Sequence, residues 1–457
     1  MEVIAIALPM IISHACDTIM VFTDRLFLAR LKPELMNAVL GGGLTSFMMM
    51  SFFLGLVGFT TALVAQHLGA KRKKDCSLVL TQALVFSFYA YPIILVLRPV
   101  AYWLFSFMGI SNQQLAPQTE YFNILIYGSI ISLARVSLSS FFSGIARTRI
   151  VMLASLAAMS TNVGLDYVFI FGKLGFPALG IQGAAYATIL GGIVGLVILS
   201  CAYFSKSNRE EFSIDNSFRF DRMLAGKLFR FGWPTGLEMC LNIIAFNAII
   251  MTFHSLGSVV ATAATIVFNW DLVSFVPLIG VEIGVTSLVG RYMGAGSPEK
   301  AHRSVISGLK LGMIYSAFVF VFFIGFPGSL VNVFRPFQAS LVFMQAVPMA
   351  VFMVRMASVY VLVEAMLCIF IGALRGAGDT VWAMRMSVTL HWMMVAVLVL
   401  LLHVLHLPAQ VGWTVVVLFF LLFSGTVFLR YRQGKWRKIR MVSPPAPLEI
   451  IPEIGEV

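Results

Sequence analysis

The chain has 457 residues, of which 59% are hydrophobic and only 11% are charged, and its formal net charge is +12. This composition excludes a soluble globular protein, and the long, continuous apolar runs exclude a transmembrane β-barrel, whose strands alternate apolar and polar residues. Because about 20 apolar residues span a bilayer as a helix, the sequence predicts an all-α polytopic membrane protein.

Hydropathy predicts twelve membrane spans joined by short connections. They lie at about 3–28, 37–64, 78–107, 119–142, 150–172, 182–204, 228–254, 260–289, 304–333, 340–373, 383–406 and 410–429. The first apolar run is too long for a secretory signal and has no charged region before it, so we expect no cleavable signal peptide.

Five cysteines are scattered along the chain without a C-x-x-C pair: Cys16, Cys76, Cys201, Cys240 and Cys368. This spacing favours small apolar helix residues over a disulfide framework or a metal site.

Basic residues gather in alternate loops, which predicts the orientation of the chain. They follow the second, fourth, sixth, eighth, tenth and twelfth spans, for example at Lys71 to Lys74, Arg147, Arg291 and Arg375. Because Lys and Arg are retained on the cytoplasmic side, we expect both termini to be cytoplasmic, in a bacterial inner membrane. The basic tail, residues 431–457, then faces lipid headgroups rather than nucleic acid, and its Pro-rich end is expected to be disordered.

Motifs recur between the two halves of the chain. Pro9 and Pro234 are 225 residues apart, and so are Gly69 and Gly294 in the similar segments H-L-G-A and Y-M-G-A. This repeat predicts two six-helix lobes, residues 1–204 and 228–430, joined by a charged linker at 205–227. An even number of spans gives both lobes the same orientation, related by a pseudo-twofold axis along the membrane normal.

The fifth predicted span carries two polar residues, Asn162 and Asp166, whose spacing places them on one face of a helix. A carboxylate inside the bilayer costs several kcal/mol, so it normally faces a polar interior and marks a transport pathway. Such a group can hold H⁺ covalently or Na⁺ through its oxygens, which makes it the simplest device for coupling transport to an ion.

Taken in order, several motifs resemble the multidrug and toxic compound extrusion (MATE) family. They are L-P-M-I-I and F-T-D-R-L-F-L in the first span, V-A-Q-H-L-G-A after the second, L-D-Y-V-F-I-F-G and G-I-Q-G-A-A-Y-A-T across the fifth and sixth, L-V-G-R-Y-M-G-A-G after the eighth, and G-A-L-R-G-A-G-D-T after the tenth. The resemblance covers nearly the whole chain. It implies a secondary transporter that exports organic, mostly cationic and amphipathic compounds in exchange for Na⁺ or H⁺.

The resemblance also implies a cation site in the amino-terminal lobe, formed by Asp24, Asn162 and Asp166. If the coupling ion is Na⁺, these three residues are its expected ligands. Thr188 either adds a hydroxyl oxygen or only packs between helices. For Asp24 the alternative is a position near the end of its helix, paired with Arg25 or Arg30.

In the carboxy-terminal lobe, Glu364 and Tyr360 fall on an acid and a tyrosine of the NorM-type branch of the family. The resemblance therefore implies a second cation or substrate site, with an interior salt bridge between Glu364 and Arg355 as the alternative. That branch carries a Glu where this chain has Asn242, and Glu238, one turn earlier, is the expected substitute.

Other polar residues lie inside predicted spans. Glu282 is a further candidate for the second site because it is interior to the eighth span. We expect Arg135 to pair with an interior acid, and His14 and His391 to be hydrogen-bonded core residues. Some of the 25 Met and 40 Phe residues should line the cavity, because thioethers and aromatic faces suit promiscuous binding.

The sequence therefore predicts a cation-coupled drug antiporter that works by alternating access between the two lobes. Pro9 and Pro234 interrupt backbone hydrogen bonds, so nearby bends are either moving parts or static kinks. A flippase for a lipid-linked or amphiphilic metabolite is the alternative. A membrane enzyme is disfavoured because H-E-x-x-H, G-x-S-x-G and D-x-x-D clusters are absent from the sequence. We expect a monomer without a cofactor, and the choice between Na⁺ and H⁺ stays open.

Overall fold

The computed structural model describes residues 2–107, 112–336 and 341–443, which form helices and short connections without a strand. The N-terminal half contains α1 (Glu2–Ala29), α2 (Pro33–Gly58), α3 (Thr60–Gly69), α4 (Lys73–Val96), α5 (Arg98–Phe107), α6 (Asn112–Tyr127), α7 (Ser129–Gly144), α8 (Thr148–Phe171) and α9 (Ile181–Tyr203). A connection follows with α10 (Lys206–Phe212) and the 3₁₀ turn η1 (Ile214–Asn216). The C-terminal half contains α11 (Arg222–His254), α12 (Ser258–Gly294), α13 (Pro298–Gly325), α14 (Pro327–Asn332), α15 (Leu341–Ala377), α16 (Thr380–Val399), the π-helical turn η2 (Leu400–Val404), α17 (Ala409–Arg432) and the 3₁₀ turn η3 (Lys435–Lys438).

The described residues form 11 long, apolar helices able to cross a membrane, and a twelfth span if α6 and α7 are counted together. These two helices meet at a bend of 48°. Two other spans combine helices, α2 with α3 and α4 with α5. The all-helical fold and its twelve spans are therefore as predicted. The ninth span was predicted to end at about residue 333, but α13 already ends at Gly325 and Pro327 begins the separate helix α14.

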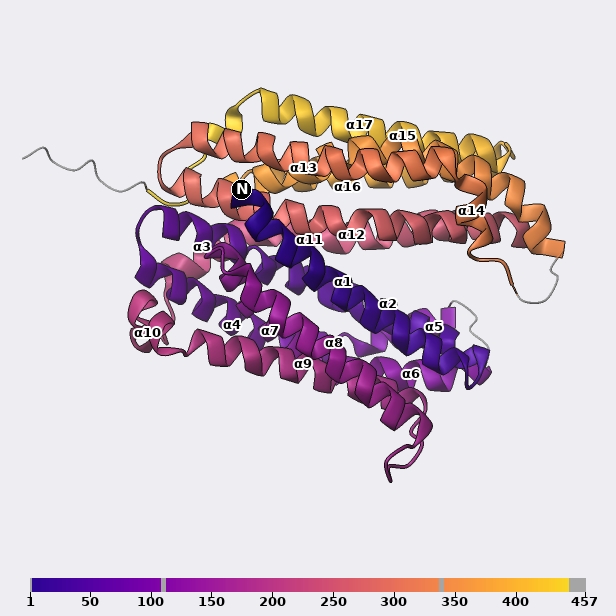
Figure 1. Ribbon diagram of the computed structural model, residues 1–457, viewed down its shortest axis with the longest axis horizontal. Helices are drawn as coiled ribbons and strands as arrows, with labels where there is room; N and C mark the ends of the chain where they lie inside the picture. Colours follow the sequence, from indigo (N-terminus) through magenta and orange to yellow (C-terminus); the bar gives the residue numbers. More distant parts are fainter. Residues whose placement is uncertain (1, 108–111, 337–340, 444–457) are drawn as a thin grey trace, which may run out of the picture.

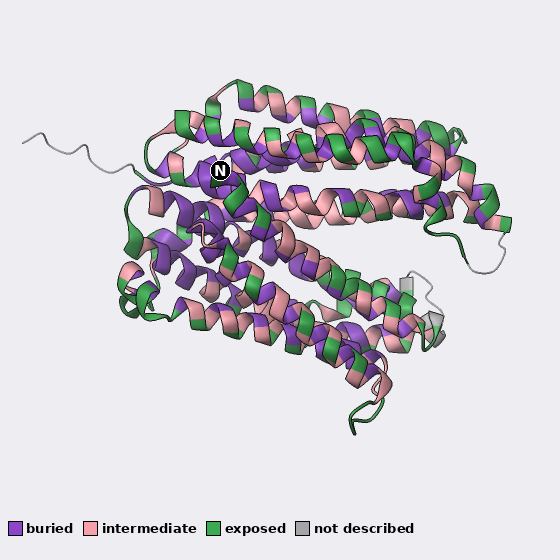
Figure 2. Ribbon diagram, viewed as in Figure 1, coloured by how far each residue is buried: buried purple, intermediate pink, exposed green. Residues whose placement is uncertain are grey.

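The two halves meet at one end of the molecule, which we call the α10 end because α10 lies there (Figure 1). The ribbons of the two halves approach each other at this end and diverge toward the opposite end (Figure 1). Hydrogen bonds that join the halves also lie here, for example from Gln66 Nε2 to the Gly376 carbonyl at 3.0 Å and from Ser287 Oγ to the Ser143 carbonyl at 2.7 Å. Buried residues concentrate at the same end (Figure 2).

Glycines allow the backbones of α3 and α12 to touch at the α10 end. A Cβ atom added to Gly69 would lie 1.8 Å from the carbonyl oxygen of Arg291, and one added to Gly294 would lie 2.0 Å from that of Gln66. No other residue type tolerates such an approach, because real Cβ atoms keep about the van der Waals distance from neighbouring atoms. Small residues are the usual means by which membrane helices pack this closely. The repeated H-L-G-A and Y-M-G-A segments thus close one end of the molecule.

The charged connection between the halves packs on the N-terminal half. Glu211 in α10 accepts a hydrogen bond from Lys73 at 2.9 Å and one from Arg147 at 2.5 Å, and Ser77 Oγ donates to the Phe212 carbonyl at 2.9 Å. The hydrogen bond from Lys73, together with Arg147, lowers the pKa of the Glu211 carboxyl group below its ordinary value. The stability that these ion pairs contribute is therefore present above the ordinary carboxyl pKa and is lost as the pH falls through the lowered one. The next helix, α11, begins at Arg222, inside the linker expected at 205–227.

The first residues of the C-terminal tail also pack against the molecule. Trp436 is buried and stacks on Tyr431, with ring centroids 5.1 Å apart, in the core of the C-terminal half. Met441 and Val442 are buried in a different cluster, formed by the N-terminal half and the start of α11. The segment between Trp436 and Met441 thus joins the two clusters, whereas the sequence suggested a tail that only faces lipid. The Pro-rich end, where disorder was expected, lies outside the described residues.

Candidate ion-coupling sites

Asp24 on α1 is the centre of a buried polar cluster in the N-terminal half. Its Oδ2 atom accepts hydrogen bonds from Thr188 Oγ1 on α9 at 3.0 Å and from the Tyr121 hydroxyl on α6 at 3.3 Å. Its Oδ1 atom accepts one from Asn162 Nδ2 on α8 at 3.3 Å. The structure therefore brings together the first span and the fifth, as the resemblance implied, and gives Thr188 a hydrogen-bonding position. Sequence reasoning missed Tyr121, which lies near the start of a bent span among polar residues such as Gln118 and Glu120 that do not single it out.

Asp166 lies in the same cluster, one helical turn after Asn162, and is fully buried. Neither of its carboxyl oxygens accepts a hydrogen bond from an N–H or hydroxyl group of the described residues. Its neighbour is the other carboxyl group, Asp24, which lies within hydrogen-bonding reach if one of the two is protonated. No ion pair of the described residues involves Asp24 or Asp166, so the alternative pairing of Asp24 with Arg25 or Arg30 is not present. Two buried carboxylates without a counter-charge are strongly unfavourable, so this cluster requires a bound cation or a proton.

The oxygen atoms of this cluster fit a hard cation. The available atoms are carboxyl, hydroxyl and amide oxygens, and Asn162 Oδ1 is a buried acceptor without a partner. Hard cations prefer such oxygen ligands. Within the described parts of the chain, no group of three or more His, Cys, Asp or Glu side chains is placed to hold a metal ion.

A second acid pair, the half-buried Asp271 and the buried Glu364, lies in the C-terminal half. The Tyr360 hydroxyl on α15 donates to Asp271 Oδ1 on α12 at 2.7 Å. Glu364 follows Tyr360 by one turn, is 2% exposed, and its Oε2 atom has no hydrogen-bond partner. Asp271 is its charged neighbour, and the alternative salt bridge to Arg355 is not found among the described ion pairs. Sequence reasoning missed Asp271, although an acid inside the eighth predicted span was a signal as strong as Glu282.

The other residues expected at the second site lie elsewhere, which corrects the predicted grouping. Glu238 and Glu282 both pair with Arg375, at 3.2 Å and 2.5 Å, near the α10 end. Asn242 Nδ2 donates to Ser387 Oγ at 2.8 Å and so does not join the acids. Arg375 itself was assigned to a loop, but it lies within α15, where the buried Glu238 and the half-buried Glu282 compensate the cost of placing a guanidinium group partly inside the protein.

The remaining interior basic residues behave largely as expected. Arg135 on α7 pairs with Asp17 on α1 at 3.2 Å, which confirms an interior ion pair. His391 Nδ1 hydrogen-bonds to the Ser387 carbonyl at 2.9 Å, as expected for a core histidine. His14 differs, because its Nε2 atom has no hydrogen-bond partner.

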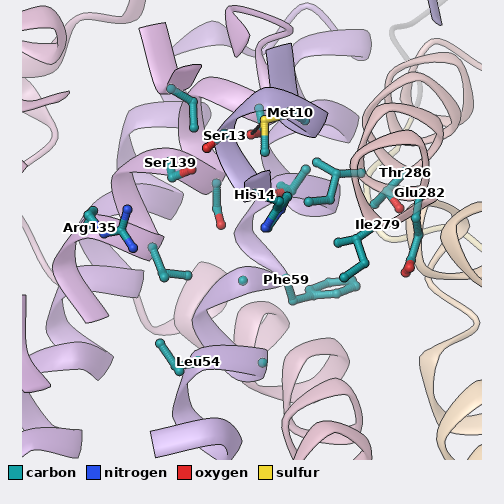
Figure 3. Close-up of a pocket in the computed structure, with 18 of the residues that line it drawn as sticks. Met10, Ser13, His14, Leu54, Phe59, Arg135, Ser139, Ile279, Glu282 and Thr286 are labelled. Carbon is teal, nitrogen blue, oxygen red and sulfur yellow. Dashed lines mark hydrogen bonds between the residues drawn. The ribbon is translucent and has the colours of Figure 1, made fainter. Parts of the chain in front are cut away.

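A cavity of about 290 Å³ lies between the two halves, and Figure 3 shows the side chains around it. Arg135 and His14 come from the N-terminal half, and Glu282 and Thr286 come from α12 on the opposite side (Figure 3). Apolar side chains, among them Leu54, Phe59 and Ile279, line much of the rest. Pockets with mostly apolar walls and a few polar groups are typical small-molecule sites.

Two halves of six spans, a cavity between them and buried, uncompensated acids in each half define a membrane transporter. A family model described as MatE matches residues 9–168 and 234–401, which is more than two thirds of the chain. The chain therefore belongs to the MatE family, and the resemblance found in the sequence is confirmed.

Similar proteins agree with this assignment. The chain is 25% identical over 443 residues to a probable multidrug resistance protein NorM of Thermotoga maritima, covering 96% of this chain and 93% of the relative. It is 26% identical over 405 residues to a probable NorM protein of Mesorhizobium japonicum, covering 85% and 84% of the two chains. These relatives are named as resistance proteins and not as enzymes, in agreement with the expectation from the sequence.

Solved structures share the fold. An outward-facing structure of a multidrug resistance MATE family transporter of the MOP superfamily has a TM-score of 0.86 and 22% identity, with 96% of each chain covered. A MOP superfamily transporter from Pyrococcus furiosus gives a TM-score of 0.86 and 21% identity over the same shares.

Proposed function

We propose that this protein is a cation-coupled antiporter that exports organic, mostly cationic and amphipathic compounds. The observation that supports this most strongly is the buried pair Asp24 and Asp166, which forms no ion pair with a basic side chain of the described residues. A pair of this kind can bind a cation or a proton that enters from one side of the membrane and release it to the other side. Each of these two steps changes the net charge of the cluster. Binding of ion and substrate in alternation then drives export against a gradient. The names of the similar proteins support multidrug compounds as the substrates.

We further propose that the α10 end faces the cytoplasm of a bacterial inner membrane. Basic residues of the connections and tail at this end include Lys71, Arg72, Lys74, Arg149, Lys206, Arg303 and Lys438. The connections at the other end carry few, Arg30, Lys32, Lys173 and Arg335. This asymmetry follows the positive-inside rule. The contacts at the α10 end then close the cytoplasmic side, so this conformation is the outward-facing one.

In the proposed cycle the two six-span units, 1–204 and 228–430, move as bodies and open alternately. In the outward-facing state the cation enters and binds at Asp24 and Asp166, with oxygens of Asn162, Thr188 and Tyr121 nearby. Substrate leaves, and the reduced negative charge of the cluster permits the change to the inward-facing state. A single chain contains every element of this cycle, so a monomer suffices.

The proposal predicts efflux of ethidium from proteoliposomes under an imposed ion gradient. The purified protein is reconstituted, and ethidium release is followed by fluorescence under a pH gradient alone and, separately, under a Na⁺ gradient alone. We expect one of the two gradients to drive efflux, and the ionophore for that ion to abolish it. Protein-free liposomes give the background. Absence of efflux under both gradients, with the protein shown to be inserted, would contradict drug antiport and favour the flippase.

We propose the pair Asp271 and Glu364 as a second cation site, because neither acid forms an ion pair with a basic side chain in the described part of the chain and neither lines the cavity. The change Glu364→Gln is therefore expected to weaken the dependence of thermal stability on the coupling ion, since a ligand that binds only the folded state stabilises it by mass action. The affinity for ethidium at saturating ion should stay unchanged. Both are measured by thermal unfolding and fluorescence titration in nanodiscs. Glu299→Gln, which removes an exposed acid paired with Arg437, is the matched control. A fall in ethidium affinity with an unchanged ion response would instead assign Glu364 to the substrate.

A further inference from the structure

The cavity between the halves has two charged walls that differ in their net charge. On the N-terminal side, Asp17 and Arg135 form one ion pair, so this wall is neutral. On the C-terminal side, Glu282 and Arg375 line the cavity, and Glu238 pairs with the same guanidinium group. Two carboxylates and one guanidinium group leave a formal charge of −1 on this wall.

The two guanidinium groups are held in different ways. Arg375 is fixed by two acids, and its Nη1 atom lies 2.5 Å from Glu282 Oε1. Arg135 instead directs both Nη atoms to a single oxygen, Asp17 Oδ1, at 3.2 and 3.3 Å. Good charge-assisted hydrogen bonds of this type are about 2.7–2.9 Å long and are often bidentate through two oxygens. Arg135 is therefore loosely bound and can accept a better partner, whereas Arg375 already pairs with two carboxylates and keeps only a buried Nε atom without a hydrogen-bond partner.

The charged groups of the two walls face each other across the cavity. Figure 3 shows Arg135 and Glu282 on opposite sides of the cavity, with His14 and Phe59 between them. His14 contributes a ring nitrogen, Nε2, without a hydrogen-bond partner. The surfaces between the charged groups are mainly apolar, including Leu54 and Ile279. An occupant thus meets a negative wall at one end, an apolar middle, and an available guanidinium group at the other end.

We infer that this cavity selects zwitterionic amphipathic molecules over otherwise equal monocations, and this inference rests on the proposed function. The ammonium or iminium end of the substrate lies toward Glu282, and its carboxylate pairs with Arg135. A monocation satisfies the negative wall but gives Arg135 no partner beyond Asp17. A monoanion meets the net negative wall and is repelled. Selectivity arises from the group that a wrong ligand leaves unpaired, as well as from the contacts that the right ligand makes.

A matched pair of dyes tests this inference: rhodamine B, which carries a free carboxylate, and rhodamine B ethyl ester, in which that carboxylate is masked. Both keep the same cationic ring system. Their dissociation constants are measured by fluorescence anisotropy with the protein in nanodiscs, and empty nanodiscs correct for partitioning. We expect rhodamine B to bind about tenfold more tightly than the ester, as one charge-assisted hydrogen bond would give.

Variants connect the preference to Arg135. The change Arg135→Gln should weaken rhodamine B about tenfold and leave the ester unaffected, so that the two dyes bind alike. Arg135→Lys should restore part of the preference, because the positive charge returns without the bidentate geometry. Asp17→Asn removes the competing carboxylate and should strengthen rhodamine B. Lys310→Gln, which removes a basic residue that does not line the cavity, should change neither dye.

The outcomes separate this inference from the proposed function. If the ester binds as tightly as rhodamine B in the unmodified protein, or if Arg135→Gln weakens both dyes equally, zwitterion selection is wrong although the transporter assignment stands. If neither dye binds and neither leaves proteoliposomes under an ion gradient, both the inference and the proposed export of amphipathic drugs are wrong.

Discussion

The change Asp24→Asn is expected to reduce gradient-driven ethidium efflux to the level of protein-free liposomes. Asn has nearly the same shape and can still accept hydrogen bonds from Tyr121 and Thr188, so the fold should be retained. Asn cannot carry the negative charge that attracts a cation, and it cannot bind and release a proton as a carboxyl group does. Asp166 then stands alone, and the cluster no longer holds two charges that need compensation.

Two measurements check this prediction. Efflux is recorded under whichever gradient drives the unmodified protein, and the melting temperature is recorded as a function of that ion. The unmodified protein should melt at higher temperature as the ion is added, because the ion binds the folded state. In Asp24→Asn this dependence should weaken to the part that Asp271 and Glu364 contribute. Asp215→Asn, which alters an exposed acid paired with Arg209, is the matched control. Normal gradient-driven efflux by Asp24→Asn would move coupling to Asp271 and Glu364.

The change Gly69→Ala is expected to disrupt the closed α10 end of the molecule. The added Cβ atom would lie 1.8 Å from the Arg291 carbonyl oxygen, and this is a backbone atom of α12 that cannot turn away. The helices must separate, and overpacking of this kind costs about 1–3 kcal/mol. If only the closed conformation carries that cost, the equilibrium shifts by about 5- to 150-fold toward the conformation that is open at this end.

A glycine of the same span provides the control. Gly58 ends α2, and a Cβ atom added there meets nothing within 4 Å, so Gly58→Ala should be neutral or slightly stabilising. Spin labels on α4 and α13, one in each half, report the separation of the α10 end by pulsed electron resonance. We expect a longer distance in Gly69→Ala and an unchanged distance in Gly58→Ala. Equal distances in the two variants would show that the close contact does not hold the end shut.

Much of this fold follows from local properties of the sequence. Twelve apolar runs gave the spans, because in a bilayer each helix must satisfy its own backbone hydrogen bonds. The positions of Asn162 and Asp166 on one helix face followed from the helical period alone. The pairing of that face with Asp24 needed the family resemblance, since no local pattern says which two spans meet.

Other features depend on contacts that no local pattern contains. Tyr121 and Asp271 are functional candidates only because α6 and α12 place them beside acids from other helices. In the sequence, Glu238 and Glu282 are interior acids and were therefore expected to be ion ligands. In the structure, both pair with Arg375. Arg375 lies at the end of a span, and a basic residue in that position normally marks the cytoplasmic side of the membrane. Its ion pairs with two interior acids could not be predicted from this position.

The tail that joins the two buried clusters limits how far they can separate. Trp436 is anchored in the C-terminal half, and Met441 is anchored in the cluster of the N-terminal half, five residues later. A fully extended chain advances at most about 3.6 Å per residue, so this tether reaches no more than about 18 Å. An opening of the α10 end that carries the two anchor points beyond this length requires Trp436 or Met441 to leave its cluster first. Whatever is attached after Val442, a fusion partner or a label, is therefore coupled to that movement.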